Sequence, residues 1–238
     1  NERVYAPFKD ARVRRAFAMS IDKDKIVQTV FFGLFTAARG ITPPGIPGFS
    51  ADYKGLAYDA TRAKALLTQA GVAGKLPPFT IAVNPGGSLY QMAAEPAAAM
   101  LKQNLGVDVG LQKTEYATFI RALIAKNVYA AFLTGWTADY LDYSDYMDVL
   151  VYSTSPFDRT NYNNPAVDRL IDQANAASTD ADRNALYHKA EAIAVDDAAM
   201  VPIFYSRSAM LKKPYVTGLE TAPWAPGYLP PARVVIQK

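Results

Sequence analysis

The chain has 238 residues, of which half are hydrophobic and a fifth are charged, and its formal net charge is +3 at pH 7. It contains no cysteine, which excludes disulfides, thiolate metal sites and a cysteine nucleophile. The 25 basic and 22 acidic residues are spread along the sequence without a basic stripe, so we do not expect nucleic-acid binding. No apolar run has the length of a membrane span. The totals predict a globular chain of one large domain or two small ones.

The first third of the chain predicts helices that are separated by loops. Three aspartates stand directly before amphipathic stripes, in the position of helix N-caps. The caps and the helices that they predict are Asp10 with a helix through residue 20, Asp22 with residues 23–32, and Asp59 with residues 60–70. Residues 36–54 contain Pro-Pro-Gly and Pro-Gly, which predict a loop.

The middle of the chain alternates strands and helices. The expected strands are 79–83, 107–113 and 129–134, and the expected helices are 88–105 and 116–126. Pro96 should kink or divide the first of these helices. The turn at 85–87 lacks the lysine and the glycine spacing of phosphate-binding loops. Strands and helices that alternate with short connections predict an α/β fold with a parallel or mixed sheet.

The last part predicts more helices and then an extended tail. The expected elements are a short helix at 144–151, a polar loop at 153–164, helices at 166–177 and 181–197, a strand at 201–205, and short extended pieces at 209–211 and 234–237. Residues 208–238 are rich in proline and aromatic residues, and we expect them to pack least against the rest.

The stretch 135–145 is the candidate ligand site. It follows a predicted buried strand, and ligands of open α/β sheets bind at the carboxyl ends of strands. Asp139 has no lysine or arginine close to it in sequence, so a ligand ammonium could make a charge-assisted hydrogen bond to it. The alternative is that Trp136 is a core tryptophan and that Asp139 forms a turn or caps a helix.

Seven stretches resemble, in the same order, the signatures of the extracellular solute-binding proteins of the peptide/nickel family, which deliver ligands to ABC importers. Trp-Thr-Ala-Asp-Tyr at 136–140 is similar to the Trp-Xaa-Ala-Asp-Tyr segment of oligopeptide-binding members. The other stretches are 7–16 (Pro-Phe-Lys-Asp-Ala-Arg-Val-Arg-Arg-Ala), 18–23, 162–171, 186–191, 201–205 and 213–218. Together they cover nearly the whole chain.

The resemblance implies an α/β, periplasmic-binding-protein-like lobe with a mixed sheet flanked by helices, plus a C-terminal extended tail. Family members have an N-terminal lobe before the signature that stands here at residue 7. We therefore expect a C-terminal half, with a ligand-binding lobe at residues 1–207 and a tail at 208–238 that would return to the missing N-terminal lobe. The expected location is periplasmic or extracytoplasmic, with a lipid anchor in the full-length protein.

The resemblance also implies how an oligopeptide would bind. Asp139 would pair with the peptide α-ammonium, and main-chain groups of Gly135, Trp136 and Thr137 would bond the peptide backbone as an added strand. Trp136 and Tyr140 would shield the charge pair. The expected partners are the oligopeptide and the permease subunits of an ABC transporter, and we expect no cofactor, no metal and no enzymatic activity.

Three further positions bear on this hypothesis. Tyr205, at the end of its predicted strand, is a candidate for lining the cleft. Leu133 stands where some oligopeptide binders have an arginine that faces the ligand carboxylate, and Tyr143 stands where relatives often have proline. A fixed grip on the C-terminus of a short peptide is therefore not expected, while longer peptides and other amine-bearing solutes remain open.

Other functions have weaker support in the sequence. His188 is the only histidine, and we expect it to lie exposed on a helix rather than in a Ser-His-Asp triad. The aspartates at 139, 142, 145 and 148 lack the glycine and glutamate of a calcium loop. A carboxylate-dependent hydrolase that uses Asp139 and Asp142 is one alternative, and a stand-alone interaction lobe is another.

Overall fold

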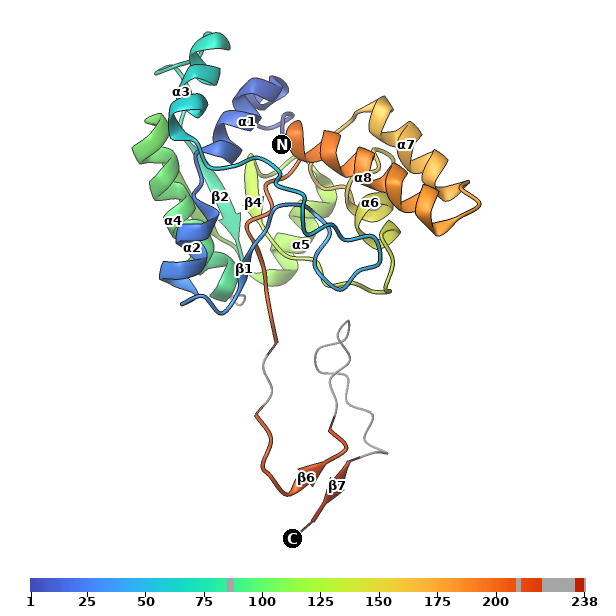
Figure 1. Ribbon diagram of the computed structural model, residues 1–238. Coiled ribbons are helices and arrows are strands. Elements are labelled where there is room, and N and C mark those ends of the chain that lie inside the picture. The colour runs from blue at the N-terminus through green and yellow to red at the C-terminus, as the bar shows by residue number, and fades with distance from the viewer. Residues whose placement is uncertain (85–87, 209–210, 220–233, 238) are drawn as a thin grey trace.

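The computed structural model describes residues 1–84, 88–208, 211–219 and 234–237 (Figure 1). The helices are η1 Ala6–Lys9, α1 Ala11–Met19, α2 Lys23–Val30, α3 Ala60–Gln69, α4 Ser88–Leu105, α5 Tyr116–Ala125, α6 Ser144–Leu150, α7 Pro165–Asn175 and α8 Asp180–Asp196. The strands are β1 Thr36–Ala37, β2 Phe79–Val83, β3 Val109–Lys113, β4 Ala131–Leu133, β5 Phe204–Tyr205, β6 Val216–Thr217 and β7 Val235–Ile236. None of the helices in the described ranges is long and apolar enough to cross a membrane.

A parallel sheet of three strands in the order β3-β2-β4 organises one half of the body. Successive side chains of a strand point to opposite faces. Ile81 and Val83 of β2 accordingly join the apolar cluster on one face, which includes residues of α1, α3 and α4. Ala82 packs on the other face with Phe119 and Leu123 of α5. The sheet is therefore covered on both faces, as expected for parallel strands that are joined by helices.

A second apolar cluster lies among α6, α7 and α8, away from the sheet. Its largest side chains, among them Tyr143, Met147 and Tyr187, are essentially inaccessible to solvent. Arginines of α1 cross from the sheet half to the end of α8. Arg14 donates to the main-chain oxygen of Asp197 at 2.8 Å, and Arg15 pairs with Asp196 at 2.6 Å. Polar contacts thus join the two halves at this point.

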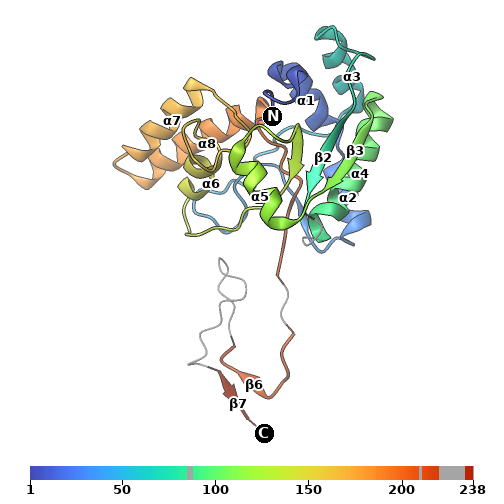
Figure 2. The same cartoon turned by 180° about the vertical axis from the view of Figure 1, so that it is seen from behind.

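The C-terminal segment first packs on the body and then leaves it. β5 pairs antiparallel with β1, with Tyr205 opposite Thr36. β6 and β7 pair antiparallel with each other and stand apart from the helices and the sheet (Figures 1 and 2). This arrangement is compatible with a tail that begins near residue 208, but the boundary between the lobe and the tail stays a prediction.

The expected α/β fold with a sheet flanked by helices is confirmed, and among the described strands the three-stranded sheet is parallel rather than mixed. Asp10, Asp22 and Asp59 accept bonds from backbone amides of the helices that they were predicted to cap. The helix after Asp22 ends at Val30, two residues before the predicted end.

Some details of the prediction were wrong. Region 36–54 contains the two-residue strand β1, because the start of β5 offers it a partner. The strand predicted at 201–205 is reduced to Phe204–Tyr205 for the same reason. α4 continues through Pro96 without division, since the alanines around the proline are buried and hold the helix against its neighbours. Of the predictions, the turn at 85–87 and most of the extended piece at 209–211 lie outside the described residues.

Candidate functional site

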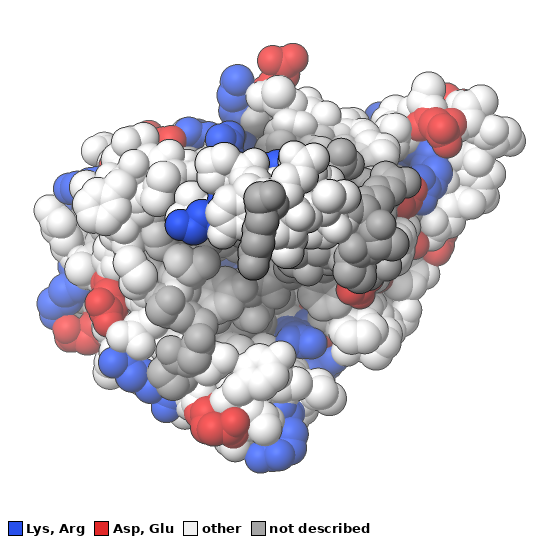
Figure 3. Space-filling view, turned by 90° about the horizontal axis from the view of Figure 1, so that it is seen from below, with Lys and Arg blue, Asp and Glu red and all other residues white. Residues whose placement is uncertain are grey.

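The loop between β4 and α6 forms the candidate site. The carboxyl ends of the sheet strands lie on the side of the body from which the C-terminal segment leaves (Figure 1). Seen from that side, the charged side chains of the described residues lie mostly towards the edges of the view (Figure 3). Gly135, Thr137, Asp139 and Tyr140 are exposed in the loop, whereas Trp136 is half-buried. The loop therefore lies at the edge of the sheet where the sequence predicted it.

Asp145 holds this loop in shape from its buried side. Its Oδ2 accepts a hydrogen bond from the Trp136 indole nitrogen at 2.9 Å and one from the backbone nitrogen of Asp139 at 3.3 Å. The side chain is fully buried, and burial raises the pKa of Asp145 while the Trp136 bond opposes that change. Asp145 lies in the first turn of α6, and from there its carboxylate holds Trp136 and the main chain of Asp139.

Asp142 is occupied by an arginine from α8. Arg183 donates to its two oxygens at 2.6 and 2.5 Å, and the backbone nitrogen of Ser144 donates to Oδ1 at 2.8 Å. The Arg183 bonds are the main reason that the pKa of Asp142 falls to about 2. A carboxylate in this state is a poor proton acceptor at neutral pH, which weakens the hydrolase alternative.

Asp148, the fourth aspartate of the series, binds residues of α7 and α8. Asp148 accepts hydrogen bonds from Tyr187 at 2.8 Å and from Asn175 at 2.6 Å. Within the described ranges no three histidine, cysteine or acidic side chains are placed to share a metal ion. The regular spacing in sequence therefore does not converge into a single acidic site.

Asp139 differs from these neighbours. Its carboxylate is exposed, and no hydrogen bond or ion pair reaches it from any residue in the described part of the chain. Trp136 directs its indole nitrogen to Asp145, and Tyr140 is 46% exposed and accepts a bond from Ser144 at 3.2 Å. The shielding that we expected from these two rings is therefore incomplete in this structure, and the carboxylate is open to a ligand.

Gly135 lies directly against a tyrosine of α4. A Cβ atom added at this glycine would stand 2.2 Å from the hydroxyl oxygen of Tyr90, so the tyrosine side chain would have to move. The absence of a side chain lets Tyr90 pack on the loop backbone. Burial raises the pKa of Tyr90, so the hydroxyl stays neutral. Sequence analysis singled out Gly135 but gave no signal for Tyr90.

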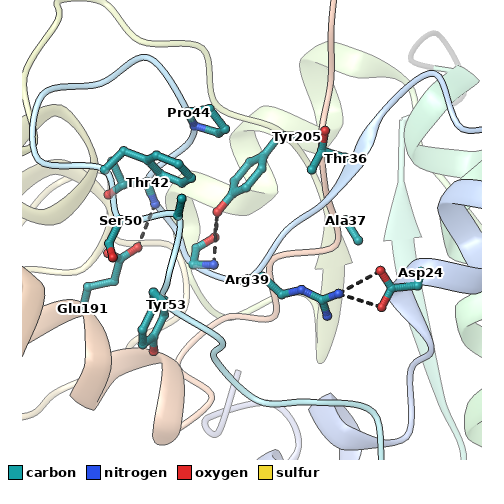
Figure 4. A pocket seen from close by; sticks show the side chains of 13 residues that line it. Asp24, Thr36, Ala37, Arg39, Thr42, Pro44, Ser50, Tyr53, Glu191 and Tyr205 are labelled. Carbon is teal, nitrogen blue, oxygen red and sulfur yellow. Dashed lines mark hydrogen bonds and ion pairs between the residues drawn. The ribbon is translucent and has the colours of Figure 1, made fainter.

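Tyr205 lines a cavity of about 300 Å³ beside β1 and β5 (Figure 4). Its hydroxyl donates to the main-chain oxygen of Gly40 at 2.8 Å and accepts from the Gly40 nitrogen at 3.1 Å. On the same wall, the buried carboxylate of Glu191 accepts from the backbone nitrogens of Ile41 and Thr42 at 2.6 and 2.8 Å. Tyr205 thus holds a loop while one face of its ring borders a cavity.

The sequence did not predict the polar group behind this wall. Glu191 also accepts a bond from the Tyr143 hydroxyl, and that hydroxyl lies 3.1 Å from Nδ1 of His188. His188 is therefore half-buried rather than exposed as expected, because α6 packs onto α8 here. Nothing in the spacing of these residues along the chain indicated that they would meet.

The fold is an α/β arrangement with an exposed loop at the carboxyl edge of its parallel sheet, and sequence comparison identifies the family of the chain. The model of bacterial extracellular solute-binding proteins, family 5 middle region, matches residues 1–158. The chain belongs to this family.

Individual relatives agree with this assignment. The probable deoxycholate-binding periplasmic protein YgiS of Escherichia coli K12 is 35% identical over 218 residues, which are 89% of this chain and 40% of that protein. The periplasmic oligopeptide-binding protein OppA of the same organism is 31% identical over 217 residues, with the same coverage. The crystal structure of Haemophilus influenzae OppA in complex with RPPGFSPFR superposes with a TM-score of 0.83 at 30% identity and covers 98% of this chain and 46% of that one.

The chain spans about 40% of the length of these curated relatives. Their names describe binding proteins rather than enzymes, and they are periplasmic. The comparison therefore assigns this chain to a family and to the matching part of that family's fold.

Proposed function

We propose that this chain is a ligand-binding lobe of the substrate-binding component of an ABC importer, and that its ligand is an oligopeptide. The observation that carries the proposal is the contrast within one loop. Asp142 binds Arg183 through both carboxylate oxygens and Asp145 accepts hydrogen bonds at Oδ2, while Asp139 presents an exposed carboxylate with no partner in the described ranges. A peptide α-ammonium is the matching charge, and it would make a charge-assisted hydrogen bond to that carboxylate.

The main chain beside Asp139 would supply the second part of the interaction. Gly135 and Thr137 are exposed, and β4 pairs with β2 on one side only among the described strands. An extended peptide that lies along residues 135–137 would bond their backbone groups as an added strand. These contacts use groups that every peptide has, which explains how one site accepts many sequences. Tyr205 would border the ligand from β5.

Relatives support the choice of ligand. Two of them are named for oligopeptide and murein-peptide binding, and one structure contains a bound nonapeptide. By the same analogy, the full-length protein would act outside the cytoplasm and deliver its ligand to the permease subunits of the transporter. A second lobe would close over the ligand about a hinge. This chain alone would make only part of the contacts, so we expect millimolar affinity, about −4 kcal/mol.

An NMR titration with trialanine tests the proposal. We expect the Trp136 indole signal and the backbone amides of residues 138–140 to shift with trialanine and not with its N-acetylated form. Asp139→Asn should abolish the shifts, whereas Asp52→Asn, at an exposed aspartate away from the loop, should retain them. Equal shifts with both peptides would contradict pairing of Asp139 with the ammonium. If deoxycholate, which carries no amine, shifts these signals and trialanine does not, the ligand is not a peptide.

A further inference from the structure

Arg159 is exceptional among the half-buried arginines of the described chain. The others are all hydrogen-bonded: Arg14 to main-chain oxygens, and Arg15, Arg39 and Arg183 to carboxylates. Arg159 is equally half-buried, yet no hydrogen bond or ion pair joins its side chain to another described residue. Removing a guanidinium from water without a partner is unfavourable. The fold thus holds one arginine cation partly desolvated and unneutralised.

The surroundings of Arg159 belong to the candidate site. Two residues earlier on the same loop, the Phe157 ring packs edge-on against Trp136, with ring centroids 5.8 Å apart. The residue between them, Asp158, turns inward, is buried, and accepts bonds from Thr160. In this loop Phe157 therefore packs against Trp136, Asp158 is buried, and Arg159 is the next residue along the chain.

The electrostatic environment of Arg159 includes a residue at the start of α5. Tyr116, the first residue of that helix, affects the pKa values of both Arg159 and Tyr90, and the Tyr90 hydroxyl lies against Gly135 of the candidate loop. Burial lowers the pKa of Arg159 and Tyr116 opposes that change, but a guanidinium remains charged at neutral pH. Asp139 and Arg159 thus carry opposite charges on two loops that meet where Phe157 packs against Trp136, and neither charge has an ion-pair partner among the described residues.

We propose that Arg159 binds a carboxylate of the peptide, so that the site takes the ammonium at Asp139 and the carboxylate at Arg159. This inference rests on the proposed function and adds a specificity-determining residue to it. Leu133, at the end of β4, has no polar side chain and cannot serve this purpose. An arginine fork matches a carboxylate with two parallel hydrogen bonds. The carboxylate is either the C-terminus of the peptide or an acidic side chain.

The test uses the complete 238-residue chain and probes that carry one charged group each. N-acetyl-trialanine has only the terminal carboxylate, N-acetyl-Ala-Glu-Ala-amide has only a side-chain carboxylate, and trialaninamide has only the ammonium. We expect one or both carboxylate probes to shift the Nε–Hε signal of Arg159, and which of the two acts identifies the source. Trialaninamide should shift residues 138–140 alone. Where the C-terminal carboxylate is the source, trialanine should bind roughly tenfold more tightly than trialaninamide, as for a hydrogen bond between charged groups.

Variants separate the role of Arg159 from general electrostatics. Arg159→Gln should remove the preference for the acid over the amide, and Arg159→Lys should retain part of it, because lysine keeps the charge without the fork. Arg121→Gln, at an exposed arginine of α5 that bonds only Thr118 among described residues, is the matched control and should change nothing. Arg159→Gln should fold normally, since it removes a partly desolvated charge.

The outcomes distinguish this inference from the proposed function. If neither carboxylate probe shifts Arg159 while trialaninamide shifts residues 138–140, the peptide function stands and the role of Arg159 is overturned. If acetate shifts Arg159 as strongly as the peptides do at equal concentration, the residue is a general anion contact and the inference is wrong. If no probe shifts either residue, both proposals fail.

Discussion

Asp139 and Asp145 are six residues apart in one loop and have opposite environments. Asp145 is buried and accepts two hydrogen bonds that fix Trp136 and the loop backbone, whereas Asp139 is exposed and its carboxylate has no partner in the described chain. The buried carboxylate builds the loop and the exposed one is left for a ligand. Residue type alone therefore does not identify a binding group; the surrounding donors do.

The largest expected effect follows from removing the buried carboxylate of Asp145, and it concerns the stability of the folded protein. Asp145→Ala would leave the Trp136 indole and the Asp139 amide without their acceptor, and we expect a loss of about 2 kcal/mol in the free energy of unfolding. Urea denaturation would measure it. Asp52→Ala, at an exposed aspartate, should change the stability by less than about 0.5 kcal/mol. An unchanged midpoint for Asp145→Ala would show that the loop is held by other contacts.

A smaller effect should appear in the pH dependence of stability. The folded pKa of Asp142, about 2, lies below its ordinary value of 3.8. The Arg183 pair therefore stabilises the fold fully above pH 4, and this stabilisation is lost as the pH falls towards 2. Thermal unfolding of Asp142→Asn beside the unchanged protein should show a difference that narrows over this range. A difference that stays constant from pH 5 to pH 2 would contradict the assigned role of the pair.

The smallest effect concerns Asp139 itself. Asp139→Asn should change the free energy of unfolding by less than about 0.5 kcal/mol, because the carboxylate supports no contact in the described chain. Its negative charge raises the pKa of Asp145 slightly, so the substitution should lower that pKa. A carboxyl-detected NMR titration would observe the change. A clear loss of stability would instead assign Asp139 a structural function.

The sequence predicted the fold well where local signals were strong. Aspartate caps and apolar periodicity placed α1, α2 and α3, and the strand at Phe79–Val83 was predicted with its observed limits. The short strands β1 and β6 were not predicted, because two residues carry no periodic pattern and need a partner from a distant part of the chain.

For the site, the sequence indicated the loop and its residues but not their differences. Asp139, Asp142 and Asp145 have the same chemistry, and only the fold brings Arg183 of α8 to one and Trp136 to another. Arg159 lies 20 residues after Asp139, and no local pattern marked it. Contacts between residues distant in sequence decide which charges are neutralised. Local patterns in a single sequence do not predict these contacts.

The arginines that cross from α1 to the end of α8 have a mechanical consequence. Packed apolar surfaces resist sliding because their side chains interlock, whereas ion pairs at a surface are weak and are screened by salt. Where Arg14 and Arg15 join the sheet half to the helical half, a main-chain hydrogen bond and an exposed ion pair should resist a small shift of the two halves less than an apolar contact of the same size would. Since the Trp136 loop runs from β4 to α6, such a shift would change the width of the ligand site without altering either core.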